Sequence, residues 1–536
     1  MRRVGDRALL VDCRDLADVH AVAGLLVAEP VPGQRDLQAG ERSVLVVLHG
    51  ERDQDRALPR LAALEVAGRT VASDRSVEIP TVYDGEDLEE VARLTGRSVE
   101  AVMTEHAATA WRAAFAGFAP GFVYLVEDGR TVPRSVVPRR AVPRASVPAG
   151  AVAVGGPYSA VYPRSSPGGW QLLGRTETLL WDLAAPDPAL VRPGDKVRFR
   201  AVRERVRTSD PTPDDASAPP SPVAGPRDTA ITVLAPGPLT LVEDLGRPGR
   251  RDLGVTPSGA ADRGAARAAN RLVGNHRTAA VLETVLGGLA LRAERDVVVA
   301  VTGAARSVEV ESEAEGEVDD AGGRRDAPAA TPLRLRAGDV LRVPVPPTGL
   351  RSYVAVRGGL DVPPVLGSRS TDVLGGLGPP PLAAGTGLPL GADVDGAVGL
   401  AEPADPPDGG TVRVRAVPGP DLAPGDGAGL WDVPWTVSPA SNRVGVRLEG
   451  TPLALTGAAE RASQGVVAGG VQVPPSGLPV VFLADHPVTG GYPVLATVVD
   501  ADRDLLAQLR PGQRLVLVRR HGRVAASGAA RDGEPA

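Results

Sequence analysis

Short apolar runs bounded by turn residues recur along most of the chain and predict a protein built mainly from β-strands. The N-terminal region differs, because apolar residues with helical spacing occur at 17–27 and 55–67, between strand-like runs. This pattern predicts a small α+β unit over residues 1–80. Two further helices are predicted at 87–94 and 98–115, each with an acidic or hydroxyl residue suited to the N-cap position.

The turn-rich segment that follows these helices predicts a β-rich unit, which completes a domain at 81–205. Residues 206–228 contain six prolines and no aromatic side chain. They cannot bury apolar surface, so we predict a linker there. A second β-rich region is predicted at 229–520, with one helix at 262–273. The alanine- and glycine-rich tail at 521–536 is predicted to be disordered.

Three sequence elements occur twice in the same order, first at 149–197 and again at 468–515. Each copy has a glycine turn before a valine run and an Arg-Pro-Gly turn before a final strand. Between them lies a Gly-Gly-aromatic turn, at Gly168–Trp170 in one copy and Gly490–Tyr492 in the other. Chance recurrence of such turns is the alternative. Because three elements keep their order, we expect a duplicated β-barrel module.

Composition and charge exclude several functions. Aromatic residues make up 3% of the 536 residues and the net charge is -6, which disfavours a nucleic-acid partner. Lys196 is the only lysine, so the chain has neither a P-loop nor a biotin-attachment lysine flanked by methionines. Cys13 is the only cysteine, and no apolar run reaches about 18 residues. We therefore expect a cytoplasmic protein with no membrane span and no internal disulfide.

Polar side chains gather around the second Gly-Gly-aromatic turn. Residues 469–498 place them between two apolar, strand-like runs. Glycines in such a turn allow the backbone to approach a bound molecule closely. A hairpin without a binding role is the alternative interpretation. The candidate residues in this stretch are Gln472, Asp485, Thr489, Gly490, Gly491 and Tyr492.

A second polar segment spans residues 240–275. Asp244 and Arg247 are three positions apart, a spacing that allows a bidentate ion pair. Asp262 is suited to cap the helix predicted after it. Two interpretations stay open for these residues and for Asn270. They stabilise loops, or they form a polar site assembled from loops.

In the first half, aromatic residues flank two Pro-Gly turns. Phe122 follows one turn, and Trp170 follows the other, shortly before Arg175. His106 lies on a predicted helix, where a lone histidine is more often a packed or capping residue than a ligand. No spacing of His, Cys or Asp matches a zinc site, so no metal site is predicted.

Two sets of ordered motifs carry a family resemblance. The first-half motifs are Ile79–Leu88, His106, Gly117–Leu125, Val147–Gly150 and Ser166–Thr176. The second-half motifs are Glu243–Arg247, Gly254–Gly259, Gly367–Thr371, Ser441–Arg443 and Gly469–Val498. Through these motifs the first half resembles the allophanate-hydrolase-subunit-1-like family, also called the 5-oxoprolinase B subunit. The second half resembles the 5-oxoprolinase C subunit, so the chain looks like a fusion of the two.

The resemblance implies a mainly β protein with two cyclophilin-like barrel halves. Residues 81–205 would correspond to carboxyltransferase subdomains A and B, and residues 229–520 to subdomains C and D. In bacteria such subunits act with a third, separate protein, the A subunit, to open 5-oxoproline to glutamate with ATP, so ATP with Mg²⁺ is the expected cofactor. The implied catalytic residues are Asp485, Thr489, Tyr492, Gln472, Asp244 and Arg247. The implied substrate- or nucleotide-binding residues are His106, Phe122, Trp170, Arg175, Asp262, Asn270, Gly490 and Gly491.

Two other functions fit the same resemblance. The domain pair also looks like the carboxyltransferase part of urea carboxylase, and like a protein pair that inhibits a sporulation histidine kinase. We see no biotin-carboxylase or biotin-carrier segment, so a self-contained urea carboxylase is not expected. An association of identical chains stays open. The sequence also departs from the family pattern at Gln464, usually Glu, and at Pro487 and Val488, usually Gln-Thr, which puts the substrate in question more than the fold.

Overall fold

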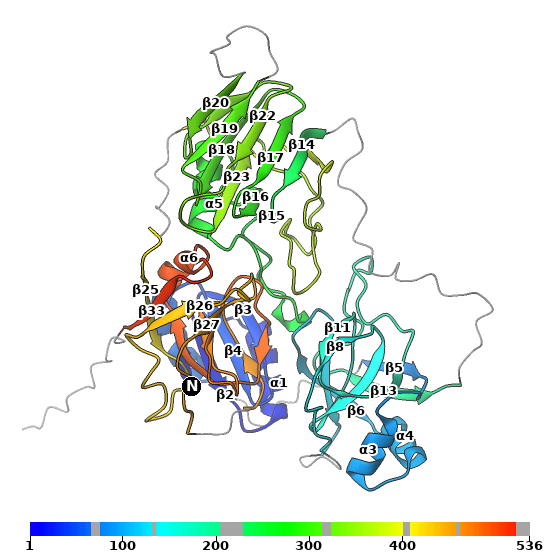
Figure 1. The fold of residues 1–536 in the computed structure, drawn as a ribbon. Coiled ribbons are helices and arrows are strands. Elements are labelled where there is room, and N and C mark those ends of the chain that lie inside the picture. Colours follow the sequence, from blue (N-terminus) through cyan, green and yellow to red (C-terminus); the bar gives the residue numbers. More distant parts are fainter. Residues whose placement is uncertain are drawn as a thin grey trace, which may run out of the picture.

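The computed structural model describes residues 1–65, 75–130, 136–203, 229–312, 323–399, 408–456 and 461–520. The predicted linker at 206–228 and the predicted tail at 521–536 lie outside the described residues. The described chain forms four units, which we call the N-terminal unit (1–62), barrel 1 (76–201), the sandwich (229–389) and barrel 2 (412–519) (Figure 1). No helix in the described ranges is long and apolar enough to cross a membrane.

The N-terminal unit is a four-stranded antiparallel sheet of order β1-β2-β4-β3 with two helices. Its alternating valines and leucines give the sheet two apolar faces. The helices cover one face, and the other packs Leu10 and Leu45 toward Val467 of barrel 2. The elements are β1 (Arg2–Val4), β2 (Ala8–Asp12), α1 (Leu16–Ala28), β3 (Gln34–Ala39), β4 (Ser43–Leu48) and α2 (Glu51–Ala62).

Barrel 1 is a seven-stranded sheet of order β12-β9-β10-β7-β6-β13-β5. A bridge between Val82 and Arg175 brings its two edges together. Two helices and a small β8-β11 ladder complete the unit. Its strands are β5 (Ser76–Thr81), β6 (Trp111–Ala116), β7 (Val123–Glu127), β8 (Arg144–Val147), β9 (Ala151–Gly155), β10 (Tyr158–Val161), β11 (Ser166–Gly168), β12 (Gln171–Arg175) and β13 (Lys196–Ala201), and its helices are α3 (Leu88–Thr95) and α4 (Val99–Ala108).

Two predictions for this region were wrong in detail. The helix expected at 98–115 ends at Ala108, and Trp111–Ala116 forms strand β6, because pairing with β7 and β13 overrides the helical propensity of its alanines. The boundary predicted at residue 80 is also misplaced. Strand β5 runs parallel to β13 in the barrel and so does not belong to the N-terminal unit.

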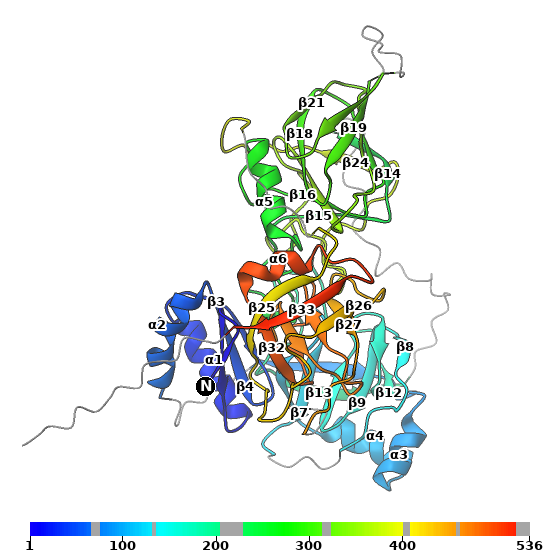
Figure 2. The same cartoon turned by 60° about the vertical axis from the view of Figure 1, so that its left-hand side comes forward.

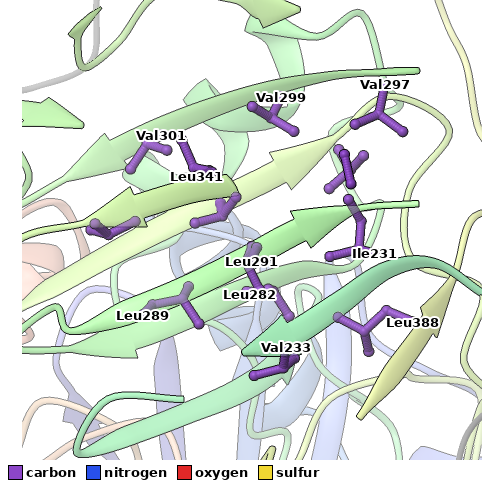
Figure 3. Packing of buried hydrophobic residues seen from close by; sticks show 14 of the residues in the cluster. Ile231, Val233, Leu282, Leu289, Leu291, Val297, Val299, Val301, Leu341 and Leu388 are labelled. Carbon is purple, nitrogen blue, oxygen red and sulfur yellow. The ribbon is translucent and has the colours of Figure 1, made fainter. Parts of the chain in front are cut away.

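The sandwich packs a six-stranded sheet, β20-β19-β22-β17-β14-β24, against a five-stranded sheet, β15-β16-β23-β18-β21. Val299, Leu291 and Leu341 are among the valines and leucines buried between them (Figure 3). Its elements are β14 (Thr229–Pro236), β15 (Leu239–Glu243), α5 (Arg263–Leu272), β16 (Val281–Val285), β17 (Leu289–Ala293), β18 (Val297–Gly303), β19 (Ser307–Glu311), β20 (Arg324–Pro328), β21 (Leu333–Leu335), β22 (Val340–Val343), β23 (Arg351–Val356) and β24 (Gly387–Pro389). The region predicted as one second domain therefore contains two β units.

Barrel 2 is a closed barrel in which β25, β32, β29, β30, β27, β26 and β33 follow one another. Read from β32, this order matches the strand order of barrel 1. In both barrels the strand that is first in the sequence pairs in parallel with the strand that is last, β5 with β13 and β25 with β33. Barrel 2 also has a small ladder, β28-β31, like the β8-β11 ladder of barrel 1. The expected duplication is therefore confirmed in the strand topology. The elements are β25 (Val412–Pro418), β26 (Pro434–Val437), β27 (Gly445–Glu449), β28 (Gln464–Gly465), β29 (Gly470–Gln472), β30 (Val480–Phe482), β31 (Thr489–Gly490), β32 (Val494–Val498), α6 (Arg503–Leu506) and β33 (Arg514–Arg519).

Barrel 2 lies at the centre of the arrangement, with the N-terminal unit and barrel 1 beside it and the sandwich beyond α6 (Figure 2). Backbone hydrogen bonds join the two halves of the chain. Gly121 N donates to Leu253 O at 3.1 Å, and Glu41 N donates to Ser463 O at 2.7 Å. The halves thus share one continuous interface, and the loops of both reach it.

Candidate functional site

A cavity of about 110 Å³ lies where the N-terminal unit, the loop after β15 and barrel 2 meet. Both halves of the chain contribute to its wall, so neither half contains the cavity by itself. Its volume is well below the ~300–1,000 Å³ typical of pockets for drug-sized ligands, which favours a small ligand over a nucleotide. The polar and charged side chains that line it are Asp6, Arg7, Arg35, Asp36, Arg251, Ser258, Arg263, His486, Thr497, Asp500 and Arg503.

Arginine dominates the electrostatics of this cavity. Five arginines and three aspartates line it, and Asp504, outside the wall, pairs with Arg263 at 2.9 Å, so an excess of one positive charge is left. Asp500 accepts from three of the arginines, with N–O distances of 2.7 Å to Arg7, 2.8 Å to Arg263 and 2.9 Å to Arg503. Burial, together with the neighbouring Arg263 charge, lowers the pKa of Arg503 to about 10. The positive excess is what an anion site requires.

Arg251 is buried, and its neighbours hold it in place. Its Nη1 donates to Val466 O at 2.9 Å, and its Nη2 lies 3.3 Å from Nε2 of His486. Nδ1 of His486 lies 2.6 Å from Pro487 O, which can only accept, so Nδ1 carries the proton and Nε2 accepts from Arg251. Burial and the Arg251 charge hold the pKa of His486 well below its usual value. His486 is thus neutral and positions Arg251.

Ser258 connects the cavity to a buried group of charges. Its φ of 53° is unusual for a residue other than glycine. Its Oγ donates to Oδ1 of Asp485 at 2.7 Å. The loop folds back so closely that a Cβ on Gly246 would lie 2.3 Å from Pro257 O, so glycine is required there. The fold of this loop therefore sets the direction of the Ser258 hydroxyl.

Asp485 belongs to a buried cluster in which three carboxylates surround Arg443. Arg443 lies 2.9 Å from Asp485, 2.5 Å from Glu283 and 3.2 Å from Glu243. Burial, with the adjacent carboxylates, raises the pKa of Glu243 well above its usual value, so this group holds a proton. Arg443 remains charged, since the carboxylates raise its pKa against the effect of burial. The cluster joins the sandwich to barrel 2.

Asp244 and Arg247 both organise the loop at 365–371, but the ion pair predicted between them does not occur within the described ranges. The Asp244 carboxylate accepts from the Ser368 and Ser370 hydroxyls, each at 2.6 Å, and from Arg369 N at 2.7 Å. Arg247 instead donates to backbone carbonyls of the same loop. Local spacing could not anticipate a loop more than 110 residues away.

Asp262 and Asn270 have structural partners. Asp262 caps α5, as predicted, by accepting from Ala265 N at 2.8 Å. Burial and the nearby Asp504 charge raise its pKa to about 6. The amide of Asn270 donates to Ala279 O and accepts from Asn275. Both residues stabilise the loop-and-helix segment next to the cavity without lining it.

The other candidates from the second half gather at the β28-β31 ladder. Gln472 donates to Tyr492 O at 3.2 Å, and Thr489 Oγ1 lies 3.4 Å from Ala116 O of barrel 1. Gly490 ends strand β31 and Gly491 follows it; a Cβ on Gly490 would lie 2.6 Å from the Gln472 amide nitrogen, so the Gln472 side chain would have to shift. Thr489 thus contacts barrel 1, the bond between Gln472 and Tyr492 lies within barrel 2, and none of these residues lines the cavity.

The candidates from the first half lie within barrel 1 or on its surface. His106 is buried, with Nδ1 2.8 Å from Tyr83 Oη and Nε2 2.8 Å from Ser159 Oγ. Phe122 and Trp170 pack edge to face within an aromatic cluster. Arg175 pairs with Asp84 in an exposed ion pair at 2.8 Å. None of the four lines the cavity.

Sequence reasoning missed the arginines and Ser258, although it had singled out the Gly254–Gly259 segment as a motif. The arginines are spread from position 7 to position 503, so no local spacing announces them. In an arginine-rich chain their residue type carries little information either. Among the described residues, no group of three His, Cys, Asp or Glu side chains could hold a metal ion.

Two family models match the chain. The model described as carboxyltransferase domain, subdomain C and D, matches residues 1–191, and the model for subdomain A and B matches residues 253–519. These labels reverse the subdomain assignment expected above, because two barrels with one strand order cannot be told apart by their shared turns.

Curated relatives agree with these matches. The second half is 39% identical over 294 residues to the 5-oxoprolinase C subunit of Escherichia coli strain K12, covering 54% of this chain and 90% of that protein. The first half is 34% identical over 230 residues to the 5-oxoprolinase B subunit of Bacillus subtilis strain 168, covering 38% of this chain and 93% of that protein. The chain belongs to the carboxyltransferase-domain family of 5-oxoprolinase B and C subunits. Both subunits are represented in this one chain.

A solved structure resembles the fused chain as a whole. The crystal structure of the protein TTHA0988 has a TM-score of 0.82 and 37% sequence identity, and the match covers 96% of this chain and 99% of that one. The arrangement of B-type and C-type segments in a single polypeptide is therefore shared by a protein of known structure.

Proposed function

We propose that this chain supplies the functions of the B and C subunits of an ATP-dependent 5-oxoprolinase and works with a separate protein like the A subunit. The observation that carries the proposal is that each half matches its own 5-oxoprolinase subunit over about nine tenths of that subunit. The composite cavity adds support. A site built from both halves explains why two such subunits would be needed together.

The proposed reaction converts 5-oxo-L-proline, ATP and two water molecules into L-glutamate, ADP and phosphate. Transfer of the γ-phosphoryl group from ATP to the lactam carbonyl oxygen would release ADP and make the carbonyl carbon a better electrophile. A first water would add to that carbon and the C–N bond would break, so that the nitrogen leaves as a protonated amine and the carbon is left as an acyl phosphate. A second water would then hydrolyse the acyl phosphate and release phosphate. The chain's own contribution is to hold the small acid out of bulk water, where charges on the protein act more strongly than in solution.

The test is glutamate release from 5-oxoproline and ATP by the purified chain together with a protein of the A-subunit type. We expect glutamate only when the chain, the second protein and ATP are all present. The chain alone, the second protein alone and a reaction without ATP serve as controls. A folded complex of the two proteins that forms no glutamate would refute the proposal.

A carboxyltransferase activity is the second candidate, because both matching family models are described by that domain. Support from relatives is narrower. The urea amidolyase of Lachancea kluyveri is 36% identical over 152 residues, and the match covers only 8% of that protein. The same assay distinguishes the two candidates if bicarbonate and a biotinylated carrier protein replace the A-type protein. Carboxyl transfer under those conditions, without glutamate release, would favour the second.

A further inference from the structure

We infer that the arginine-lined cavity binds a small carboxylate that also carries an N–H group, and that Ser258 selects the ligand by accepting a hydrogen bond from that N–H. The inference rests on the proposed function, because 5-oxoproline is a ring lactam with one carboxylate and one N–H. It goes further by assigning the ligand to this cavity and by naming the residue that recognises the lactam.

The carboxylate end of the ligand is matched by the positive excess of the cavity. Arg251 is the best-placed partner, because it is buried and its Nε finds no hydrogen-bond acceptor among the described residues. The nearest carboxylate oxygen, on Asp36, lies 3.6 Å from that nitrogen. Arg503 pairs with Asp500, a carboxylate that two other arginines also contact. A buried guanidinium with an unused donor gains a charge-assisted hydrogen bond when a carboxylate arrives.

The direction of the Ser258 hydrogen is set by Asp485. A serine hydroxyl has one hydrogen and two lone pairs. The Asp485 oxygen at 2.7 Å is a charged acceptor and is closer than Thr371 O at 3.2 Å, so the hydrogen points to Asp485. Asp485 cannot turn away, because Arg443 grips both of its oxygens and Val373 N donates to one of them. Ser258 therefore has only lone pairs left for a ligand.

Most of the other side-chain acceptors in the wall are already in use. Asp36 accepts from Leu37 N and Gly249 N, Asp6 accepts from Asp500 N, and Asp500 accepts from three arginines. Arginine has no acceptor, and the Nε2 lone pair of His486 faces Arg251. The Thr497 hydroxyl has no partner among the described residues, so it can turn to donate or to accept and does not distinguish the two kinds of ligand. Ser258 is the neutral hydroxyl whose hydrogen is held elsewhere, so it can only accept from an N–H on the ligand. A ring oxygen in the same place would instead face lone pairs and be repelled.

This arrangement predicts discrimination between two ligands of nearly equal shape. The lactone analogue of 5-oxoproline, in which oxygen replaces the ring N–H, keeps the carboxylate but loses the donor. A site built to hydrogen-bond a ligand group rejects an analogue without it, and we expect roughly 10-fold or greater preference for the lactam. The lactam 2-pyrrolidinone keeps the N–H but lacks the carboxylate, so we also expect it to bind roughly 10-fold or more weakly.

The experiment is calorimetric titration of the purified full chain with L-5-oxoproline, the lactone acid and 2-pyrrolidinone. For Ser258→Ala, we expect the lactam-to-lactone affinity ratio to fall close to one, while the carboxylate preference remains. For Arg503→Gln, we expect weaker binding of both acids with an unchanged ratio. Ser476→Ala, at an exposed turn away from the cavity, is the matched control and should bind as the unmodified chain does.

Several results would overturn the inference. Equal affinity of the unmodified chain for lactam and lactone would do so even if Ser258→Ala failed to fold. An unchanged ratio in folded Ser258→Ala, or no binding of 5-oxoproline at all, would also do so. The proposed function fails separately, through absent glutamate release in the presence of the A-type protein. Ser258-dependent lactam binding without turnover would leave this site assignment standing.

Discussion

Barrel 1 and barrel 2 have the same strand order, but different kinds of side chain are buried at one equivalent turn, aromatic in barrel 1 and charged in barrel 2. In barrel 1, the turn between β6 and β7 leads into packed aromatic rings, including Phe122 and Trp170. In barrel 2, the equivalent turn between β26 and β27 carries Arg443, which three buried carboxylates surround. One duplicated scaffold thus supports an aromatic core in one copy and a charged junction in the other.

The difference follows from what covers each barrel. The sandwich lies against barrel 2 and brings Glu243 and Glu283 to Arg443, whereas the rings of barrel 1 pack mainly among residues of barrel 1 itself, with Leu16 and Ala39 of the N-terminal unit beside them. The N-terminal unit adds Arg7 and Asp36 on another side of barrel 2. The buried charged groups therefore lie where separate units meet and do not follow from the shared strand order of the barrels. The same fold can in general carry different sites.

The largest effect is expected when the charged junction of barrel 2 loses Arg443. Arg443→Met keeps most of the volume but leaves buried carboxylates without their partner. Breaking a buried ion pair in this way costs about 3–5 kcal/mol. Scanning calorimetry should show an earlier transition for the sandwich and barrel 2.

Arg175→Met is the matched control, because the Arg175–Asp84 pair on barrel 1 is exposed. Such surface pairs contribute about 0–1 kcal/mol, so the control should melt close to the unmodified chain. If Arg443→Met melted no earlier than Arg175→Met, the contrast drawn between the two barrels would be wrong.

The second prediction concerns His106, a buried polar residue in barrel 1. His106→Phe retains ring packing against Trp111 and Phe199 but removes the partner of the Tyr83 hydroxyl and one of the two partners of Ser159, which keeps its bond to Ala153 O. Unpaired buried polar groups make a cost of about 1–3 kcal/mol reasonable. The rate of glutamate release should nevertheless stay within about threefold of the unmodified chain's rate, since His106 lies in barrel 1 and does not line the cavity.

Its pH dependence gives a second check. Burial lowers the pKa of His106 to about 3, below the unfolded value of ~6.5, so wild-type stability falls as pH drops through that window. Phenylalanine does not titrate, and the deficit of the variant should shrink toward acid pH. Loss of turnover without loss of stability would return His106 to the role that the sequence suggested.

The sequence was informative where a pattern is local. Turn residues revealed the duplication, and Asp262 was recognised as a helix cap from its position alone. It failed where distant segments meet. Arg7 and Arg503 share one carboxylate across nearly the whole chain, and Asp244 serves a loop more than 120 residues away. Contacts between residues so far apart leave no recognisable spacing in the sequence. The family resemblance therefore suggested a reaction but did not indicate which residues line the cavity.

The third prediction uses Asp372, which lies beside the charged junction. Burial and the Asp485 charge raise its pKa to about 7, and its Oδ2 lacks a hydrogen-bond partner. Because this pKa exceeds the unfolded value of ~3.9, wild-type stability falls as pH rises from about 4 to about 7. Asp372→Asn removes the titration and should stabilise the chain by about 1–2 kcal/mol above pH 8.

Measuring unfolding free energies of both chains at pH 5 and pH 8 checks this expectation. The difference should grow with pH and level off above pH 8. A difference that is constant with pH would mean that Asp372 does not titrate between pH 5 and pH 8, and that burial and the Asp485 charge do not raise its pKa into this range.

The smallest effect is expected at Gln464, where the family usually has Glu. Gln464 lies in strand β28 of the small ladder of barrel 2, and its Nε2 donates to Oδ2 of Asp421 at 2.5 Å. In Gln464→Glu, two carboxylates would face each other, and one of them must take a proton, which raises its pKa. We expect the unfolding free energy to fall by about 1 kcal/mol at pH 8, and this loss should diminish toward pH 5.

Gln464→Met is the control, because it loses the hydrogen bond without adding charge. In thermal melts it should show a loss of stability that does not depend on pH. Equal pH profiles for the two variants would mean that Arg2, whose Nη1 lies 3.2 Å from Asp421 Oδ1, offsets the added charge and that this end of barrel 2 tolerates the family's Glu.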